Sequence, residues 1–164
     1  MQARFFDANN LVRLHVIAHD DTEWAQAMKM YVVKAIRREA KKIAMSANDA
    51  SDAFSRFASA HSRLKRCAKR TLRIRWCLQP VEVQTGTFHF PDRVYGEEIV
   101  PEGDYRAVRV VLGSGTGKNW WCVVYPNLCA VEQACAQALS QPGNVQFYSS
   151  IAKYVAQWMR GRIG

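Results

Sequence analysis

Apolar and polar residues alternate near the start of the chain, and the spacing then changes to that of a helix. In residues 11–18, LVRLHVIA, leucine and valine alternate with Arg13 and His15, which predicts a β-strand. Asp20 and Glu23 have the spacing of a capping box, so we expect a helix to begin there. The expected apolar stripe of this helix is Trp24, Met28, Tyr31, Ala35 and Ile36. A turn at residues 45–52 leads to a second predicted helix, with apolar positions Phe54, Phe57, His61, Leu64 and Ala68.

A period of two returns in the second half of the chain and predicts a sheet. The alternating positions are Ile74, Trp76 and Leu78 and, after a break at Pro80, Val81, Val83 and Phe88. Residues 106–113 and 119–126 predict two more strands, and the glycine-rich connection between them predicts an antiparallel hairpin. Helical spacing reappears after Cys129, to about residue 139, and again from residue 147.

This order of elements predicts an α+β fold. We expect a mixed, largely antiparallel sheet with two N-terminal helices packed on it, and C-terminal helices. The predicted domain covers residues 1–130, and residues 131–164 form a helical segment that packs on it or extends it. The chain has 164 residues, 49% of them hydrophobic, so it can bury a core without help from metals or disulfides.

Positive charge is concentrated in one part of the sequence. The formal net charge is +9, and residues 29–75 alone hold 14 Lys and Arg against three acidic residues, a local +11. A basic sector of this kind could face nucleic acid, an anionic membrane or an acidic partner. The simpler interpretation is that it forms the solvated faces of two helices. No aromatic residues interleave on the polar side, which argues against a stacking platform for single strands.

The motifs that could carry catalysis are incomplete. The glycine loop GSGTGKN lacks the spacing, the Ser or Thr after the lysine, and the following helix of a phosphate-binding loop. His15, His19, Asp20 and Asp21 could serve a metal or acid-base chemistry, but no third ligand is placed, and a half-buried His15 beside a helix cap on Asp20 is favoured. A small hydrolase using the two histidines and Asp20 stays an alternative. The sequence contains no nucleophile elbow.

The five cysteines allow more than one interpretation. They contain no C-x-x-C pair, so zinc-ribbon and thioredoxin-like sites lack their signal. Cys122 and Cys129 flank VVYPNL, and Pro126 can reverse the chain between them. They could be two packed thiols in a cytosolic protein, or a bridge in an exported one.

Two stretches of the sequence resemble the stage II sporulation protein R family, over residues 11 to about 131. The first stretch is matched at Arg13, Leu14, His15, Val16, Ile17, Ala18, Gln26, Lys29 and Val32. The second, denser stretch is matched at Gly86, Thr87, Phe90, Pro91, Tyr95, Gly96, Pro101, Gly103, Tyr105, Ala107, Arg109, Val110, Gly113, Gly115, Gly117, Asn119, Trp120, Trp121, Cys122, Pro126, Leu128 and Cys129. The chain departs from the family pattern at His19, Asp20, Val33, Lys34, Arg93, Ser114 and Asn127.

The resemblance implies a signalling protein and not an enzyme. Proteins of this family are made in the forespore of endospore-forming bacteria and exported to the space between the forespore and mother-cell membranes. There they trigger a membrane-embedded aspartic protease of the mother cell, which removes the pro-sequence of sigma-E. We therefore expect no catalytic residue, cofactor, metal or nucleotide, and no nucleic-acid partner. The intermembrane location favours a bridge between Cys122 and Cys129.

The glycine loop and the paired tryptophans are the expected contact with that protease. The residues concerned are Gly113, Gly115, Gly117, Asn119, Trp120 and Trp121. Neighbouring residues on a strand point to opposite faces, so one tryptophan is expected in the core and the other at the surface, unless helices bury both. The basic sector from Lys29 to Arg75 remains open to an acidic surface or an anionic membrane, and a basic-surface binding protein is the alternative function.

The sequence also bears on cellular location. No run approaches the ~20 apolar residues that a membrane span needs. The first twenty residues lack the apolar centre and cleavage site of a secretion signal. Taken as it stands, the sequence predicts a soluble protein, but a chain from which an export signal had been trimmed would show the same pattern, and the resemblance implies an exported location.

Overall fold

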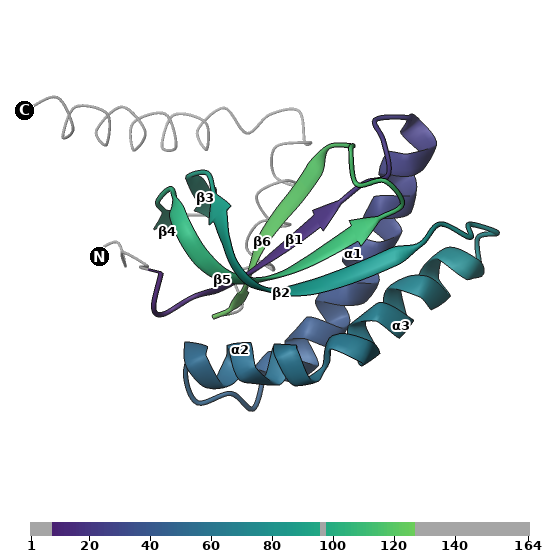
Figure 1. Cartoon of the computed structure of the whole chain (residues 1–164). Coiled ribbons are helices and arrows are strands. Elements are labelled where there is room, and N and C mark those ends of the chain that lie inside the picture. Colours follow the sequence, from purple (N-terminus) through teal and green to yellow (C-terminus); the bar gives the residue numbers. More distant parts are fainter. Residues whose placement is uncertain (1–7, 96–97, 127–164) are drawn as a thin grey trace, which may run out of the picture.

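A computed structural model of the chain describes residues 8–95 and 98–126, which form an α+β fold (Figure 1). The elements in chain order are β1 (Val12–Ile17), α1 (Glu23–Ala44), α2 (Ala50–Ser59), α3 (His61–Arg73), β2 (Val81–Phe90), β3 (Arg93–Tyr95), β4 (Glu98–Val100), β5 (Gly103–Leu112) and β6 (Asn119–Tyr125). The fold class is as predicted. The predicted C-terminal helices and the boundary at residue 130 lie outside the described residues.

The main sheet has four strands in the order β2-β5-β1-β6. β1 runs parallel to β5 and antiparallel to β6, and β2 is antiparallel to β5. The predicted hairpin of β5 and β6 is therefore wrong, because β1 lies between them. Five of the six residues of β1 are buried, as expected for a central strand that is covered on both faces of the sheet. The connection at residues 113–118 then crosses two strand spacings, about 10 Å.

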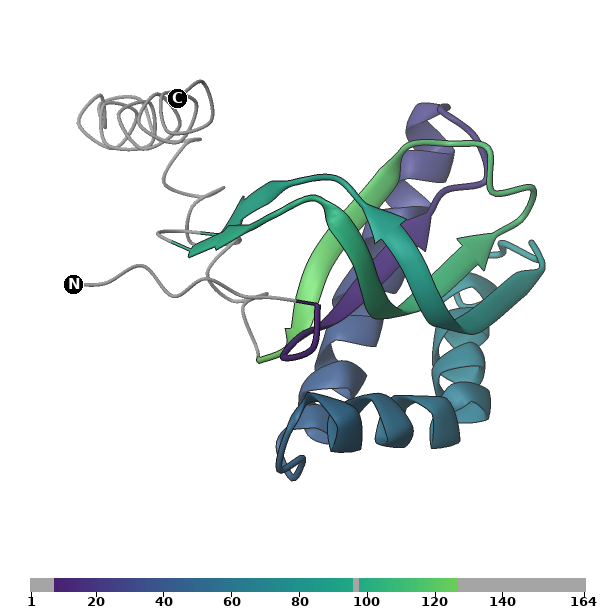
Figure 2. The same ribbon diagram turned by 60° about the vertical axis from the view of Figure 1, so that its left-hand side comes forward.

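A two-stranded ribbon continues one side of the sheet. β2 and β5 pair along their whole length up to Phe90 and Gly103, and β3 and β4 then pair from Arg93 and Val100 onward. Figure 2 shows this ribbon extending beyond the four-stranded sheet, away from the helices. The sequence pattern had not predicted β3 and β4.

All three helices cover the same face of the sheet (Figures 1 and 2). The core on this face joins Val12, Leu14 and Val16 of β1 to the buried sides of the helices. The buried residues of α1 are Ala25, Met28, Lys29, Val32, Val33, Ile36, Ala40, Ile43 and Ala44. The predicted stripe is correct at Met28 and Ile36 but wrong at Trp24 and Tyr31, which are 50% and 45% exposed. The buried side of α1 is centred on Val32, so those two aromatic residues lie at its margin.

The local signals at the helix ends differ in detail from the prediction. The N-cap of α1 is Thr22, whose side-chain oxygen accepts from the Ala25 amide, while Asp20 accepts from the Thr22 amide and hydroxyl. The N-cap therefore lies two residues after Asp20, and the expected capping box of Asp20 and Glu23 is not formed, because Glu23 is the first residue of the helix. The second predicted helix is two helices, α2 and α3, which meet at Ala60. Phe57, of the predicted apolar positions, lies in the core as expected.

The strand predicted from Ile74 to Leu78 is wrong. The amides of residues 76 and 77 donate to Arg73 O and Leu72 O, which closes the end of α3 and leaves them unavailable to a sheet. Trp76 takes a positive φ of 58°, and its side chain is 95% exposed. Alternating exposure in this segment therefore reflects a helix end, with Cys77 buried and its neighbours facing solvent.

Candidate interaction site at the glycine loop and the paired tryptophans

The glycine loop, residues 113–118, is bonded along its backbone to the connection between β1 and α1. The amides of Thr116 and Gly117 donate to His19 O and Ala18 O, both at 3.1 Å. The amide of Lys118 donates to the Asp21 carboxylate at 2.7 Å. These bonds link segments about a hundred residues apart and hold the loop against the body of the protein.

Side chains reinforce the same contact. The hydroxyls of Ser114 and Thr116 donate to His19 O at 2.6 and 2.9 Å. The Ser114 amide donates to His19 Nδ1 at 2.8 Å, so this nitrogen acts as the acceptor and carries no proton in this arrangement. His19 and Asp20 lie 3.9 Å apart at the exposed edge of the network. His19 therefore has a structural part in positioning the loop.

The glycines of the loop are required by its backbone and by its close packing. Gly113 and Gly115 have φ values of 57° and 64°, where residues with a side chain are strained. A side chain at Gly117 would collide with the carbonyl oxygen of Asp20. The glycine pattern is thus explained by the conformation of the loop, without a phosphate.

The buried Lys29 of α1 also stabilises the contact between the glycine loop and the β1–α1 connection. Its ammonium group donates to Gln26 Oε1 at 2.6 Å and to Lys118 O at 3.0 Å, and Gln26 in turn donates to Asp20 O at 2.8 Å. Lys29 is 5% exposed, and burial lowers its pKa from the usual range. Sequence reasoning had counted Lys29 in the basic sector. The structure instead buries it as a brace for the glycine loop.

The two tryptophans lie on opposite faces of the sheet and are both half-buried. Trp120 packs against the helix-side core, with the Arg37 guanidinium 5.8 Å from the ring centroid. Trp121 packs on the other face, where it stacks on His15 at 3.8 Å between ring centroids and meets Phe90 edge-on at 5.0 Å. The alternation of faces was predicted. The division into one core and one surface residue was not observed, because each ring has one covered side.

His15 lies beneath Trp121 and is 6% exposed. Its Nε2 atom has no hydrogen-bond partner among the described residues, while the Asn119 side chain bonds to the ring. The pKa of His15 is lowered to about 4, mainly by burial and in smaller part by the charges of Arg109 and Arg13, while the hydrogen bond from Asn119 acts in the opposite direction. The imidazole is therefore neutral at pH 7. The sequence favoured a structural, half-buried His15, and the structure buries it almost completely.

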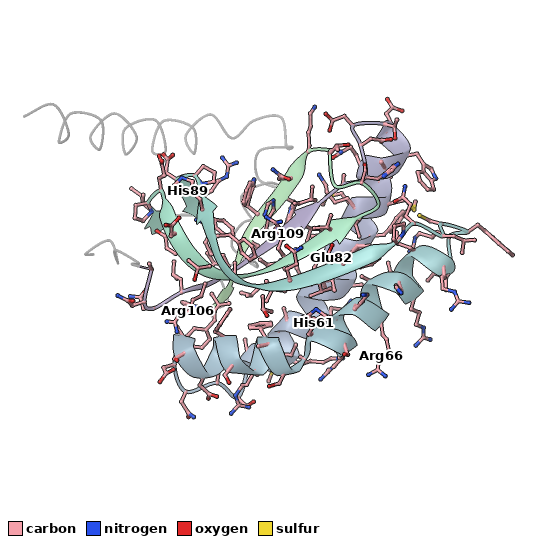
Figure 3. All side chains as sticks on the ribbon, viewed as in Figure 1. His61, Arg66, Glu82, His89, Arg106 and Arg109 are labelled. Carbon is pink, nitrogen blue, oxygen red and sulfur yellow. The ribbon has the colours of Figure 1, made fainter. Side chains whose placement is uncertain are left out.

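The alternating Arg13 and His15 indicate a second packed layer on this face that was not recognised from the sequence. Arg13 is fully buried, with its guanidinium 4.2 Å from the Phe90 ring centroid and 5.0 Å from that of Tyr105. Figure 3 shows Arg109 on the same sheet, and its Nε donates to Gln84 at 3.0 Å. The sequence signal for this layer was the presence of two basic residues on the same face of an otherwise apolar strand.

The groups proposed for the hydrolase alternative are not assembled into one site. His19 and Asp20 lie at the glycine loop, whereas His15 is held under Trp121. In the part of the chain that the structure describes, no group of three or more His, Cys, Asp or Glu side chains is placed to hold a metal ion. The same residues include no helix that is both long and apolar enough to cross a bilayer.

The proposed disulfide involves one residue inside and one outside the described part. Cys122 is fully buried on β6, and Cys129 lies outside the described residues, so the pairing stays a prediction. Cys67 and Cys77 are free cysteines, and burial raises the pKa of the Cys67 thiol.

The outer side chains of the loop are available to a partner. Ser114, Thr116, Lys118 and Asn119 are exposed, but the Ser114 and Thr116 hydroxyls are engaged with His19 and the Asn119 amide with His15. Lys118 uses its backbone in the network and leaves its side chain in solvent. The site is therefore a rigid loop that presents a lysine beside two half-covered tryptophans.

Comparison with known proteins places this fold in a family. The family model described as stage II sporulation protein R matches residues 8–135. Stage II sporulation protein R of Bacillus subtilis (strain 168) is 28% identical over 130 residues, which are 79% of this chain and 58% of that protein. The chain thus spans less than two thirds of the length of this relative. No solved structure gives a significant match. The matched region contains the whole of the described fold, including the glycine loop and both tryptophans, and the chain belongs to the stage II sporulation protein R family.

Proposed function

We propose that this protein is a non-enzymatic sporulation signal that activates a membrane-embedded aspartic protease of the mother cell. In this proposal it is made in the forespore and exported to the intermembrane space, and the activated protease processes pro-sigma-E. The observation that carries the proposal is membership of the stage II sporulation protein R family over residues 8–135. In this space a bridge between Cys122 and Cys129 would form under oxidising conditions.

The glycine loop is the proposed contact because it is rigid and exposed at once. Its amides and two hydroxyls are held by His19, Ala18 and Asp21, so little conformational freedom is left to lose when a partner binds. Trp120 and Trp121 follow the loop in β6, half-buried on opposite faces of the sheet, and tryptophan is frequent at the centres of protein interfaces. Lys118 adds a positive charge that an acidic patch on the protease would complement.

Activation requires more than binding. The signal must bind the active arrangement of the protease better than the inactive one, and the shift in population cannot exceed that difference in affinity. A rigid surface suits this task, because it fits one arrangement of the partner and resists adapting to the other. The active state in the proposal is a dimeric protease held together by contact with the loop.

The test is processing of a pro-sigma-E reporter in cells that carry the protease, with and without this chain exported beside it. We expect cleavage to depend on the chain. Lys118→Glu is expected to reduce cleavage about tenfold, the effect of losing one well-placed interfacial contact. Lys34→Glu is the matched control, since Lys34 is an exposed lysine of α1 away from the loop.

The outcomes separate the function from the surface. Absence of cleavage with the wild-type chain folded and exported would contradict the signalling function. Normal cleavage by Lys118→Glu, Trp120→Phe and Trp121→Phe would leave the function standing and exclude the loop as its contact. Melting curves of the purified variants confirm that each is folded.

A further inference from the structure

The segment after α3 presents three apolar side chains to solvent. Ile74, Trp76 and Leu78 are 68%, 95% and 83% exposed. They lie in the connection between α3 and β2, which forms the right-hand tip of the molecule in Figure 1. We call these three residues the apolar tip. Large apolar side chains that are exposed together in this way are a common feature of binding surfaces.

The apolar tip is held in place by the end of α3. The Cys77 amide donates to Leu72 O at 3.1 Å and the Trp76 amide to Arg73 O at 3.0 Å, the bond pattern of a Schellman cap. Cys77 and Leu72 are both buried, so they anchor the segment in the core. Arg75 donates to Thr71 O at 2.8 Å and lies 3.8 Å from the Tyr31 ring centroid. These contacts fix the conformation of the apolar tip while its side chains project into solvent.

A basic hollow adjoins the tip. It has a volume of about 840 Å³, and Ile74 of the tip forms part of its wall. The other lining residues are Glu39, Arg63, Arg66, Cys67, Lys69, Arg70, Thr71 and Arg73. Figure 3 shows Arg66 pointing outward from α3, away from the sheet. Apolar and basic surface thus meet at one residue.

Most of this positive charge is unpaired. Glu39, the acidic residue of the hollow, is bonded to Arg63 and Lys42. Among the described residues no carboxylate forms an ion pair with Arg66, Lys69, Arg70 or Arg73. Residues 53–81 contain no acidic residue at all. The hollow therefore favours anions.

We propose that the apolar tip and the basic hollow dock this protein on an anionic lipid bilayer. Ile74, Trp76 and Leu78 enter the headgroup region, and the arginines and lysines of α3 contact lipid phosphates. This combination is how peripheral proteins bind membranes, with apolar insertion and basic attraction acting together. The inference does not depend on the proposed protease contact, which lies at the glycine loop.

A bilayer fits this surface better than a macromolecule of defined shape. Ile74 and Leu78 protrude, so a protein partner would need a matching pocket, whereas the interfacial region of a bilayer accepts protruding apolar side chains. A nucleic acid would use the arginines and could stack on Trp76, but it would leave the aliphatic side chains in water. The aliphatic part of the tip is what favours lipid.

The test is co-sedimentation of the full 164-residue chain with vesicles of phosphatidylglycerol and phosphatidylcholine, or of phosphatidylcholine alone. We expect binding to the anionic vesicles that weakens as salt is raised. Trp76→Gly is expected to lower the partition coefficient about tenfold or more, because the variant lacks the large apolar side chain that would move from water into the bilayer on binding. Glycine suits the positive φ at this position, so the variant keeps the helix end intact.

Matched controls isolate the two parts of the surface. Met45→Ser removes another apolar side chain, 76% exposed at the end of α1, and is expected to leave binding unchanged. Arg66→Glu is expected to weaken binding at least tenfold, while Arg93→Glu on the distant β-ribbon has little effect.

Four results would each overturn the proposal: equal binding to neutral vesicles, no loss in Trp76→Gly, DNA retention that needs Arg66 but not Trp76, or a self-association that Trp76→Gly abolishes. The third would indicate a nucleic-acid surface, and the fourth an interface between copies of the chain.

Discussion

The buried His15 predicts that this fold weakens in mildly acidic solution. In the folded protein the pKa of His15 is lowered to about 4 from 6.5, mainly by burial. Protonation therefore favours the unfolded chain, and stability that is present above pH 6.5 is lost as the pH falls toward 4. The physical reason is that the added charge would lie on a buried ring, stacked under Trp121 and close to Arg13 and Arg109.

The size of the effect follows from the two pKa values. For a single group that titrates at 6.5 unfolded and about 4 folded, linkage gives a loss of about 2 kcal/mol between pH 7 and pH 5, and about 3 kcal/mol by pH 4. The carboxylates of Asp20, Asp52 and Glu39 have lowered pKa values and begin to contribute only at more acidic pH. The interval from pH 7 to pH 5 therefore reports on His15.

The assay is urea denaturation at pH 7, 6 and 5, with the unfolding free energy read from midpoint and slope. His15→Phe is the control, because phenylalanine keeps an aromatic ring under Trp121 and does not titrate. We expect the wild type to lose about 2 kcal/mol over this interval and the variant to lose much less. Equal losses in the two proteins would refute the assignment of the acid sensitivity to His15.

Three further predictions concern the local devices of the fold. Thr22→Ala removes the N-cap bond to the Ala25 amide and should cost about 1 kcal/mol in urea denaturation, whereas Thr22→Ser should cost little. Gly117→Ala should destabilise the protein more than Gly86→Ala. The added Cβ would collide with the Asp20 carbonyl at residue 117, whereas at residue 86 it would only contact the Phe88 ring at 3.6 Å. A reversed order of melting temperatures would contradict the packing described for the loop. Trp76→Gly should leave the melting temperature equal or higher, since the residue sits at φ 58° with an exposed ring, and a clear fall would show that Trp76 packs in solution.

Local sequence patterns predicted the elements whose structure depends on the spacing of their own apolar residues. The period-two run at residues 11–18 is β1, the run from Val81 is β2, and the helical spacing after residue 20 is α1. Such patterns depend on burial of one side of an element, which the sequence records directly. The structural position of His15 in its strand was also expected, although the sequence predicted a half-buried residue and the structure buries it almost completely.

The segment at residues 74–78 shows why a pattern alone can mislead. Alternation of large apolar residues there suggested a strand, but Cys77 is the buried member and Ile74, Trp76 and Leu78 face solvent. A helix end with one residue at positive φ produces the same alternation as a strand over five residues. The family resemblance identified the glycine loop and the tryptophans from the sequence, yet the role of each glycine depends on contacts that span about a hundred residues.

The sequence by itself determined the fold class, most of the elements and the family, because these depend on local spacing and on matched motifs. Only the tertiary structure decided that β1 lies between β5 and β6, that Lys29 is buried under the glycine loop, and that the apolar tip adjoins the basic hollow. Strand order and the burial of a charge depend on which distant segments supply partners. The packing of the whole chain determines these partners, so they cannot be inferred from any short stretch of the sequence.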